Sequence, residues 1–120
     1  AGDPAFGHMA ARLRDGIGSL DRATSHQLAA LSSNRPEAAL AGATPYLRLY
    51  GLTLGAACLA RSALAASAAR KAGETDPAHA ARIALARFYA ENLLVAASGL
   101  EQAVVEGGAF TDDAALALAV

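Results

Sequence analysis

The stretch AGATPYLRLYGLTLGAACLARSALAASAA, residues 41–69, decides the fold, because it has the pattern of one long helix that is apolar almost all the way round. Between Tyr46 and Ala66 its only charged residues are Arg48 and Arg61. Glycine and alanine occupy many of the remaining positions, so neighbouring helices can approach its backbone closely. A helix that is apolar on all sides needs cover on all sides. The stretch therefore predicts the central helix of a bundle.

A long amphipathic helix is predicted before this stretch. Asp3 can cap its start, and Pro4 fits the first helical position, where no amide hydrogen is needed. Apolar side chains then recur at steps of three and four residues until the Ser-Ser-Asn sequence at 32–34 ends the helix. We expect the apolar face to pack against the bundle and the opposite face to meet solvent. The apolar face comprises Phe6, Met9, Ala10, Leu13, Ile17, Leu20, Thr24, Leu28 and Leu31, and the polar face comprises Arg12, Asp15, Ser19, Arg22 and His26.

A third long helix is predicted after the apolar one. Gly73 can end the apolar helix in a left-handed conformation, and Asp76 with Pro77 repeats the cap-and-proline start. We expect the third helix to run unbroken to Glu106, because the glycine pair at 107–108 is a stop signal. Its inward face is predicted to carry Leu85, Phe88, Tyr89, Asn92, Leu93, Ala96, Leu100 and Ala103.

Shorter segments complete the predicted fold. Residues 36–40 can form a helical turn after Pro36, and Thr44 with Pro45 can cap and begin the apolar helix after a break near 42–44. Thr111 is expected to cap a short last helix over 114–119. The predicted fold class is all-α, an up-down bundle of three long helices plus a short extra helix, which is a three- or four-helix bundle.

Length and composition agree with one domain over residues 1–120. The net charge is −1, and no basic stripe is present that could neutralise phosphates, so we expect no nucleic-acid partner. The longest uncharged apolar run, residues 49–60, is shorter than the ~20 residues that cross a bilayer, so we expect no membrane partner. The single cysteine, Cys58, is expected to be a buried, inert thiol, which fits a cytoplasmic location.

The sequence predicts no catalytic, cofactor-binding or metal-binding residues. His8 and His26 lie ~27 Å apart along one helix, and His79 is on another, so we expect no shared metal ion. The glycine-rich phosphate loops and the nucleophile elbow are absent from the sequence. Three carboxylates of the third helix are expected to be solvated rather than to form an acid–base pair. They are Glu91, Glu101 and Glu106.

Five residues are candidates for an interface with a neighbour. Arg48 and Arg61 are isolated cations on the apolar helix, and an arginine at an interface needs a carboxylate or phosphate in bidentate geometry. Exposure of the arginines to solvent at the side of the bundle is the alternative. Tyr46 and Tyr50 lie beside them, either in the core or at the interface. Asn92 falls among apolar residues, so its amide needs a buried or interfacial partner.

Two segments carry a resemblance to a known family. They are ATPYLRLYGLTLGAACLARSALAA, residues 43–66, and ARFYAENLLVAASGLEQAVVEGG, residues 86–108. Together they resemble the C-terminal helical extension of acyl-CoA dehydrogenases, in the branch that includes 3-methylmercaptopropionyl-CoA dehydrogenase-like enzymes. The matching residues are Tyr46-Leu47, Tyr50-Gly51, Phe88-Tyr89-Ala90-Glu91, Leu93-Leu94 and the glycines at 107–108.

The chain departs from the family pattern at two places. Ala56 and Ala57 stand where the family often has a bulky aromatic residue, and Val95 stands where a proline is common after the Leu-Leu pair. We expect neither departure to break a helix.

The resemblance implies a role without catalysis for this segment. Enzymes of the family are flavoproteins of fatty acid metabolism, oxidoreductases that oxidise an acyl-CoA thioester between its α and β carbons with FAD and a glutamate base. Those parts belong to an upstream catalytic core, so the resemblance implies FAD and acyl-CoA for the parent enzyme and no cofactor for this segment. Residues 1–120 would be the C-terminal fragment, inactive alone. It would serve packing, oligomer contacts or active-site access against the catalytic core or another subunit of a homo-oligomer.

Two alternatives remain at the level of the sequence. The chain could be a self-standing helical protein–protein interaction module whose exposed apolar faces bind a partner. A helical enzyme that binds a metal or ligand is disfavoured by the inventory of possible ligands.

Overall fold

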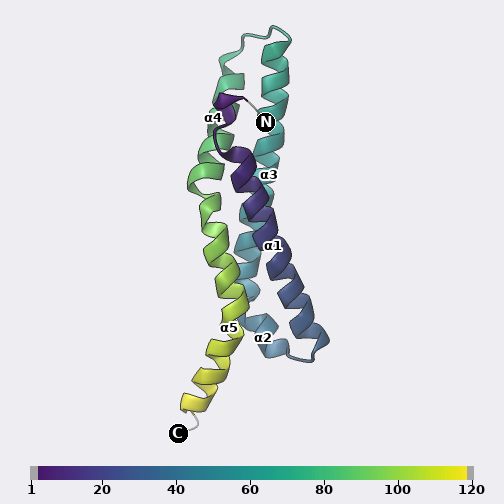
Figure 1. The fold of residues 1–120 in the computed structure, drawn as a ribbon, viewed down its shortest axis with the longest axis vertical. Helices are drawn as coiled ribbons and strands as arrows, with labels where there is room; N and C mark the ends of the chain where they lie inside the picture. The colour runs from purple at the N-terminus through teal and green to yellow at the C-terminus, as the bar shows by residue number, and fades with distance from the viewer. Residues whose placement is uncertain (1–2, 119–120) are drawn as a thin grey trace.

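The computed structural model shows an up-down arrangement of helices, which confirms the all-α bundle. It describes the backbone of residues 3–118 and the side chains of residues 3–109 and 118, with no strand in that part of the chain. α1 (Met9–Ser32) runs down, α3 (Ala43–Lys71) returns, and α4 (Pro77–Asn92) and α5 (Ala97–Leu118) run down again (Figure 1). The short α2 (Pro36–Ala41) crosses the lower end and is the predicted extra element.

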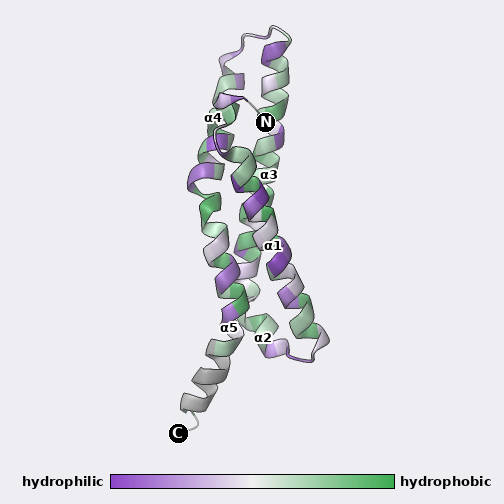
Figure 2. Ribbon diagram, viewed as in Figure 1, coloured by the Kyte–Doolittle hydropathy of each residue, from purple (hydrophilic) through white to green (hydrophobic). Residues whose placement is uncertain are grey.

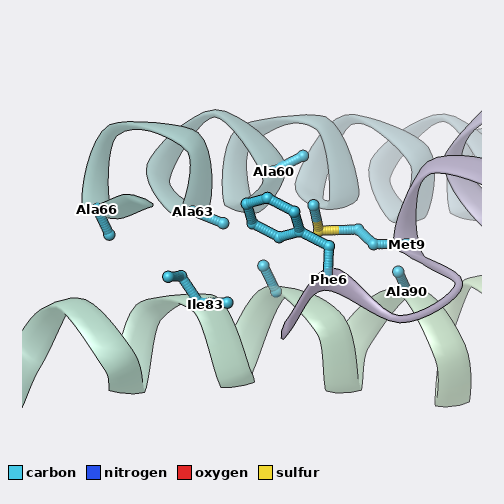
Figure 3. Close-up of a cluster of buried hydrophobic side chains, with 8 residues drawn as sticks. Phe6, Met9, Ala60, Ala63, Ala66, Ile83 and Ala90 are labelled. Atoms are coloured by element: carbon cyan, nitrogen blue, oxygen red, sulfur yellow. The ribbon is translucent and has the colours of Figure 1, made fainter. Parts of the chain in front are cut away.

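The first helix is interrupted near its start, which corrects the prediction of one helix from Asp3. Asp3 does cap a 3-10 turn, η1 (Pro4–Phe6), and accepts a hydrogen bond from the Ala5 amide at 2.9 Å. Gly7 then adopts a positive φ of 53° before α1 begins. This turn directs Phe6 between α3 and α4 (Figure 3), where its ring is buried. A helix continuing through Gly7 would carry Phe6 elsewhere.

The boundaries of α3 follow the sequence closely, with one correction. Gly42 is the N-cap residue and Thr44 makes no capping hydrogen bond, because the helix already begins at Ala43. Pro45 is tolerated in the first turn, where its missing amide hydrogen is not required. At the other end Gly73 has a φ of 98°, which confirms the left-handed residue after the helix. Asp76 caps α4 by accepting from the Ala78 amide at 2.9 Å.

The third predicted helix is broken at one place and continues past another, so the expectation was wrong twice. It breaks at Leu93, and η2 (Leu94–Ala96) is a 3-10 turn before α5. At the glycine pair 107–108 no break occurs, and α5 extends through residue 118. The separate last helix predicted over 114–119 was therefore wrong, because the backbone there continues α5. The side chain of Thr111 and residue 119 lie outside the described residues.

Glycines 107 and 108 lie inside α5, where they allow α2 to approach it closely. A Cβ added to Gly108 would lie 3.1 Å from the Cβ of Ala38, and one added to Gly107 would lie 3.4 Å from the carbonyl oxygen of Ala41. Gly42, between α2 and α3, also approaches α5 closely, because a Cβ there would lie 3.0 Å from the carbonyl oxygen of Val104. The glycines therefore mark a close helix contact and not a chain turn.

Most of the buried residues of α1 have small side chains, whereas the predicted inward face consisted mainly of large apolar ones. Large residues expected in the core, Ile17, Leu28 and Leu31, are exposed. Ser19, expected on the polar face, is buried. A Cβ at Gly16 would lie 2.9 Å from Cδ1 of Leu94, so the glycine allows that leucine to fill the space. The buried residues of α1 are Met9, Gly16, Ser19, Ala23 and Ala30.

The same correction applies to α4 and α5. Leu85, Phe88 and Leu93 were predicted to face inward, and all three are exposed. The buried residues keep a helical period across the break at η2. Most of them lie one position along the helix from a residue that was predicted to be buried. They are His79, Ile83, Ala86, Ala90, Leu94, Ala97 and Val104. Small side chains on facing helices allow closer contact than the predicted faces would.

The molecule is long and thin for its mass. Its principal extents are 69 × 25 × 20 Å and its Cα radius of gyration is 18.7 Å, whereas a compact chain of this length has a radius of gyration of about 14 Å. The accessible surface is 7506 Å², against about 6,000 Å² for a typical folded monomer of this mass. Apolar segments recur along the part of the helices that Figure 2 colours by hydropathy. Much apolar surface is therefore left without cover.

Two segments are long and apolar enough, by length and composition, to cross a membrane. They are α3 and the line of helices from Pro77 to Ala109. About a third of each apolar window is buried inside the bundle, 33% for α3 and 28% for the second segment. Core helices of proteins in water share this property, so it defines no location by itself.

Candidate interaction surface

One side of α3 is left uncovered by the other helices. Its residues recur at steps of three and four, and they lie opposite the buried side, which packs Leu49, Ala56, Ala60 and Ala63 into the bundle. Leu47 is 70% exposed and Tyr50 is 47% exposed. We call this side the outer face of α3, and it consists of Leu47, Tyr50, Gly51, Leu54, Cys58 and Arg61.

The predicted cover on every side of α3 is therefore absent from the described part of the chain. α1, α4 and α5 cover the inward half, and the outer face remains open. Large apolar side chains that are exposed together are uncommon on monomers and mark sites of interaction. Tyr50 and Arg61 were among the interface residues predicted from the sequence, whereas Leu47, Leu54 and Cys58 were not. Their signal was their position opposite the alanine-rich side of the helix.

Two tyrosines hold α3 in its orientation. The hydroxyl groups of Tyr46 and Thr24 are 2.8 Å apart, which joins α3 to α1. The Tyr89 hydroxyl donates to the Leu52 carbonyl oxygen at 2.9 Å, which joins α4 to α3, and its burial raises the pKa of this phenol. The Tyr46 hydroxyl is thus bonded inside the bundle. The centres of the Tyr46 and Tyr50 rings are 6.5 Å apart, their planes are at 49°, and Tyr50 is half exposed.

Arg48 and Arg61 are both exposed, and within residues 3–109 neither has a hydrogen bond or an ion pair. Two other arginines in the described part of the chain are paired. Arg22 donates two hydrogen bonds to Glu101, at 2.8 and 3.0 Å. Arg87 donates to Glu91 at 2.6 Å. Arg48 and Arg61 are therefore cations available to a partner.

The paired carboxylates respond to their arginines. Hydrogen bonding from Arg22 lowers the pKa of Glu101, and hydrogen bonding from Arg87 lowers the pKa of Glu91. Both groups stay ionised at neutral pH and belong to separate ion pairs. Neither is poised as a general acid, whose pKa must be raised.

The full length of the bundle agrees with one known family. Residues 1–115 match the sequence profile of the family described as acetyl-CoA dehydrogenase C-terminal like. The chain belongs to this family. The match covers every helix from η1 to most of α5, including the outer face of α3. No curated protein and no solved structure matches the chain.

Asn92 lies on a second exposed apolar area of this acetyl-CoA dehydrogenase C-terminal like domain. It was expected to need a buried or interfacial partner, but its side chain is exposed and donates to the Phe88 carbonyl oxygen of its own helix at 3.0 Å. Leu85 and Phe88 are exposed on the same side of α4. The amide is therefore satisfied within α4, and the large apolar neighbours are the part of this area that could meet another surface.

Cys58 corrects another expectation. It lies near the middle of the outer face of α3 and is exposed, whereas the sequence predicted a buried thiol. The helix is apolar on both sides at this position, so the hydrophobicity of its neighbours in sequence did not distinguish the covered side from the uncovered side.

The hollows in the surface of this family member do not indicate a catalytic site. One of about 450 Å³ lies between the start of the chain, α4 and the end of α3, and its Arg87 and Glu91 are already paired. Across the described residues no three histidine, cysteine, aspartate or glutamate side chains gather as metal ligands. His79, the buried histidine, bonds instead to Glu74 at 2.8 Å in the α3–α4 hairpin.

Proposed function

We propose that this domain is the noncatalytic C-terminal bundle of an FAD-dependent acyl-CoA dehydrogenase and that the outer face of α3 packs against the catalytic core of that enzyme. The single observation that carries the proposal is the uncovered apolar face on a domain of this family. A side of a helix on which exposed apolar residues recur at steps of three and four is typical of a docking surface. The catalytic core would supply the flavin, the acyl-CoA site and the base.

The finer features of the proposal follow from the resemblance. We place the parent enzyme in the branch that includes 3-methylmercaptopropionyl-CoA dehydrogenase-like enzymes, because Tyr46, Tyr50 and the segment Phe88–Glu91 carry that branch's pattern. Tyr46 and Tyr89 serve there as contacts between helices, and Tyr50 is left for the neighbour. The proposed enzyme is a cytoplasmic homo-oligomer, and the domain contributes to its packing, its subunit contacts or access to its active site.

A protein partner suits the outer face of α3 better than a lipid bilayer does. Arg48 and Arg61 would lie within a membrane-spanning α3, and a charge near the bilayer centre is costly. The second apolar segment is interrupted by the turn at Leu93. We therefore assign both segments to contacts between proteins.

Cys58 provides the test, because it lies within the proposed contact. In the complete protein that the gene encodes, the rate of Cys58 alkylation would be measured under native conditions and in urea, with the modified peptide identified by mass spectrometry. Docking predicts that the native rate is at least about tenfold slower than the unfolded rate, which corresponds to about 1.4 kcal/mol of protection. Equal rates would mean that the face is free and would contradict the proposal.

The reading frame upstream of Ala1 separates this proposal from the second candidate, a self-standing helical interaction module. The same exposed faces of α3 and α4 favour that candidate. A flavoprotein core encoded upstream supports the dehydrogenase. A gene that encodes these residues alone would favour the module, and light scattering would then show whether it is a monomer or an assembly.

A further inference from the structure

The charges on α3 all have one sign. Between Ala43 and Lys71 the helix has no aspartate or glutamate, and its charged residues are Arg48, Arg61, Arg70 and Lys71. Arg61 lies within the outer face and Arg48 at its margin, next to Leu47. Thirteen residues separate the two arginines, so their Cα atoms are about 20 Å apart along the axis.

Docking would remove both arginines at least partly from water. A guanidinium that loses water without gaining a counter-charge is strongly unfavourable. Within residues 3–109 no carboxylate pairs with Arg48 or Arg61, and Glu91 and Glu101 are already bonded to Arg87 and Arg22. The missing counter-charges must therefore come from the surface that covers the face.

A second copy of α3 does not provide those counter-charges. In a two-fold contact between outer faces, α3 would meet only another helix without carboxylates, and arginines would approach arginines. Like charges brought together at an interface cost several kcal/mol. A contact between α3 and a different face of a second copy would not be two-fold symmetric, so it would close only as a ring of three or more copies and would otherwise propagate as a filament.

We propose that the outer face of α3 docks on an apolar surface of the catalytic core whose margin carries two carboxylates about 20 Å apart, one paired with Arg48 and the other with Arg61. Leu47, Tyr50 and Leu54 fill the apolar part of this contact. The two ion pairs set its register along the helix, because bidentate pairing of arginine with carboxylate is directional. This inference rests on the proposed function and specifies the chemistry of the partner surface.

An anionic membrane surface is the competing source of negative charge, and the observations favour the protein. Helices that lie in a membrane surface are rich in lysine and arginine along a free polar face. Here α3 has four cations, of which Arg70 and Lys71 lie in its last turn, and Arg48 and Arg61 are about 20 Å apart along the axis. Two well separated guanidinium groups suit two defined carboxylates better than a continuous layer of anionic lipid.

Charge reversal tests the pairing in the complete protein. Arg48→Glu, Arg61→Glu and the double variant would be compared with the wild type by the native alkylation rate of Cys58. Each reversal is expected to raise that rate about tenfold or more, because an ion pair is replaced by a like-charge contact.

Arg14→Glu is the matched control, since Arg14 is exposed on α1 away from the bundle, and it should leave the rate unchanged. Arg48→Lys with Arg61→Lys keeps the charge and should have a smaller effect. Circular dichroism would establish that each variant is folded.

The outcomes separate this inference from the proposed function. If Cys58 is protected in the wild type and charge reversal leaves it protected, the domain docks but the carboxylate pairing is wrong. If Cys58 is unprotected in the wild type, the proposed docking itself fails. If the wild type instead sediments with vesicles containing phosphatidylserine and the reversals abolish that binding, the partner is a membrane and the inference is overturned.

Discussion

Gly51 and Gly55 lie one turn apart on α3, and the structure gives them different roles. A Cβ at Gly55 would lie 2.7 Å from the Tyr89 hydroxyl oxygen, whereas a Cβ at Gly51 would have no atom within 4 Å. The sequence predicted that the glycines and alanines of this helix allow neighbouring helices to approach closely. Of the two glycines, that holds within the bundle for Gly55 alone, and Gly51 lies on the outer face of α3.

Alanine substitutions at the two glycines should have opposite effects on stability. Gly51→Ala is expected to raise the free energy of unfolding by about 0.5–1 kcal/mol, the gain in helix propensity at an exposed position. Gly55→Ala is expected to lower it by about 1 kcal/mol, because Tyr89 must move and its hydrogen bond to Leu52 is lost. Urea unfolding of the 120-residue chain, followed by circular dichroism, measures both. A stabilising Gly55→Ala variant would show that Tyr89 does not pack there.

At the scale of the helices, the inward faces were the least accurate part of the sequence prediction. Periodicity identified where the helices are, but the largest apolar residues were taken to be the buried ones. In α1 most of the buried positions are alanine, glycine or serine, with Met9 as the large exception. In α4 they are two alanines together with Ile83 and His79, while Leu85 and Phe88 are exposed. Because small residues permit close backbone approach, the packing between helices favours them over the larger side chains, which are then left outside.

Leu93 and Leu94 provide a direct test of this assignment. Leu94 is 1% exposed and packs against Gly16, whereas Leu93 is 46% exposed. Leu94→Ala is expected to lower the free energy of unfolding by about 2–4 kcal/mol, because it opens a cavity in the core. Leu93→Ala, the matched control, removes the same atoms from a half-exposed position and should cost less than about 1 kcal/mol. If both variants lowered the free energy of unfolding by similar amounts, the assignment of Leu94 to the core and Leu93 to the surface would be wrong.

For the whole molecule, the all-α class and the direction of the helices followed from the sequence, while the division of the last helix into α4 and α5 and the extended shape did not. Ala-rich helices pack closely but form a thin bundle with little interior, so large apolar residues along α3 and α4 remain outside. The candidate site was predicted only in part for the same reason. Tyr50, Arg48 and Arg61 are exposed as an interface requires, whereas Tyr46 bonds inside the bundle and Asn92 bonds to its own helix.

Solution scattering should detect the extended shape. The separated 120-residue chain, measured at low concentration after size exclusion, is expected to have a radius of gyration of about 18–21 Å, near the 18.7 Å of the Cα atoms. A value close to about 14 Å would indicate that the helices fold back into a compact globule. Such a globule would cover the outer face of α3 and contradict the docking proposal as well.

The sequence by itself determined the helices, most of their ends and their antiparallel order, because capping residues, proline positions and helical periodicity are local signals. The residues that carry the family resemblance were likewise readable from the sequence alone. Only the tertiary structure decided which side of each helix is buried, that glycines 107–108 admit α2 instead of ending α5, and that Cys58 is exposed. Those outcomes depend on how closely two backbones approach, which is a property of facing helices together and cannot be read from either helix alone.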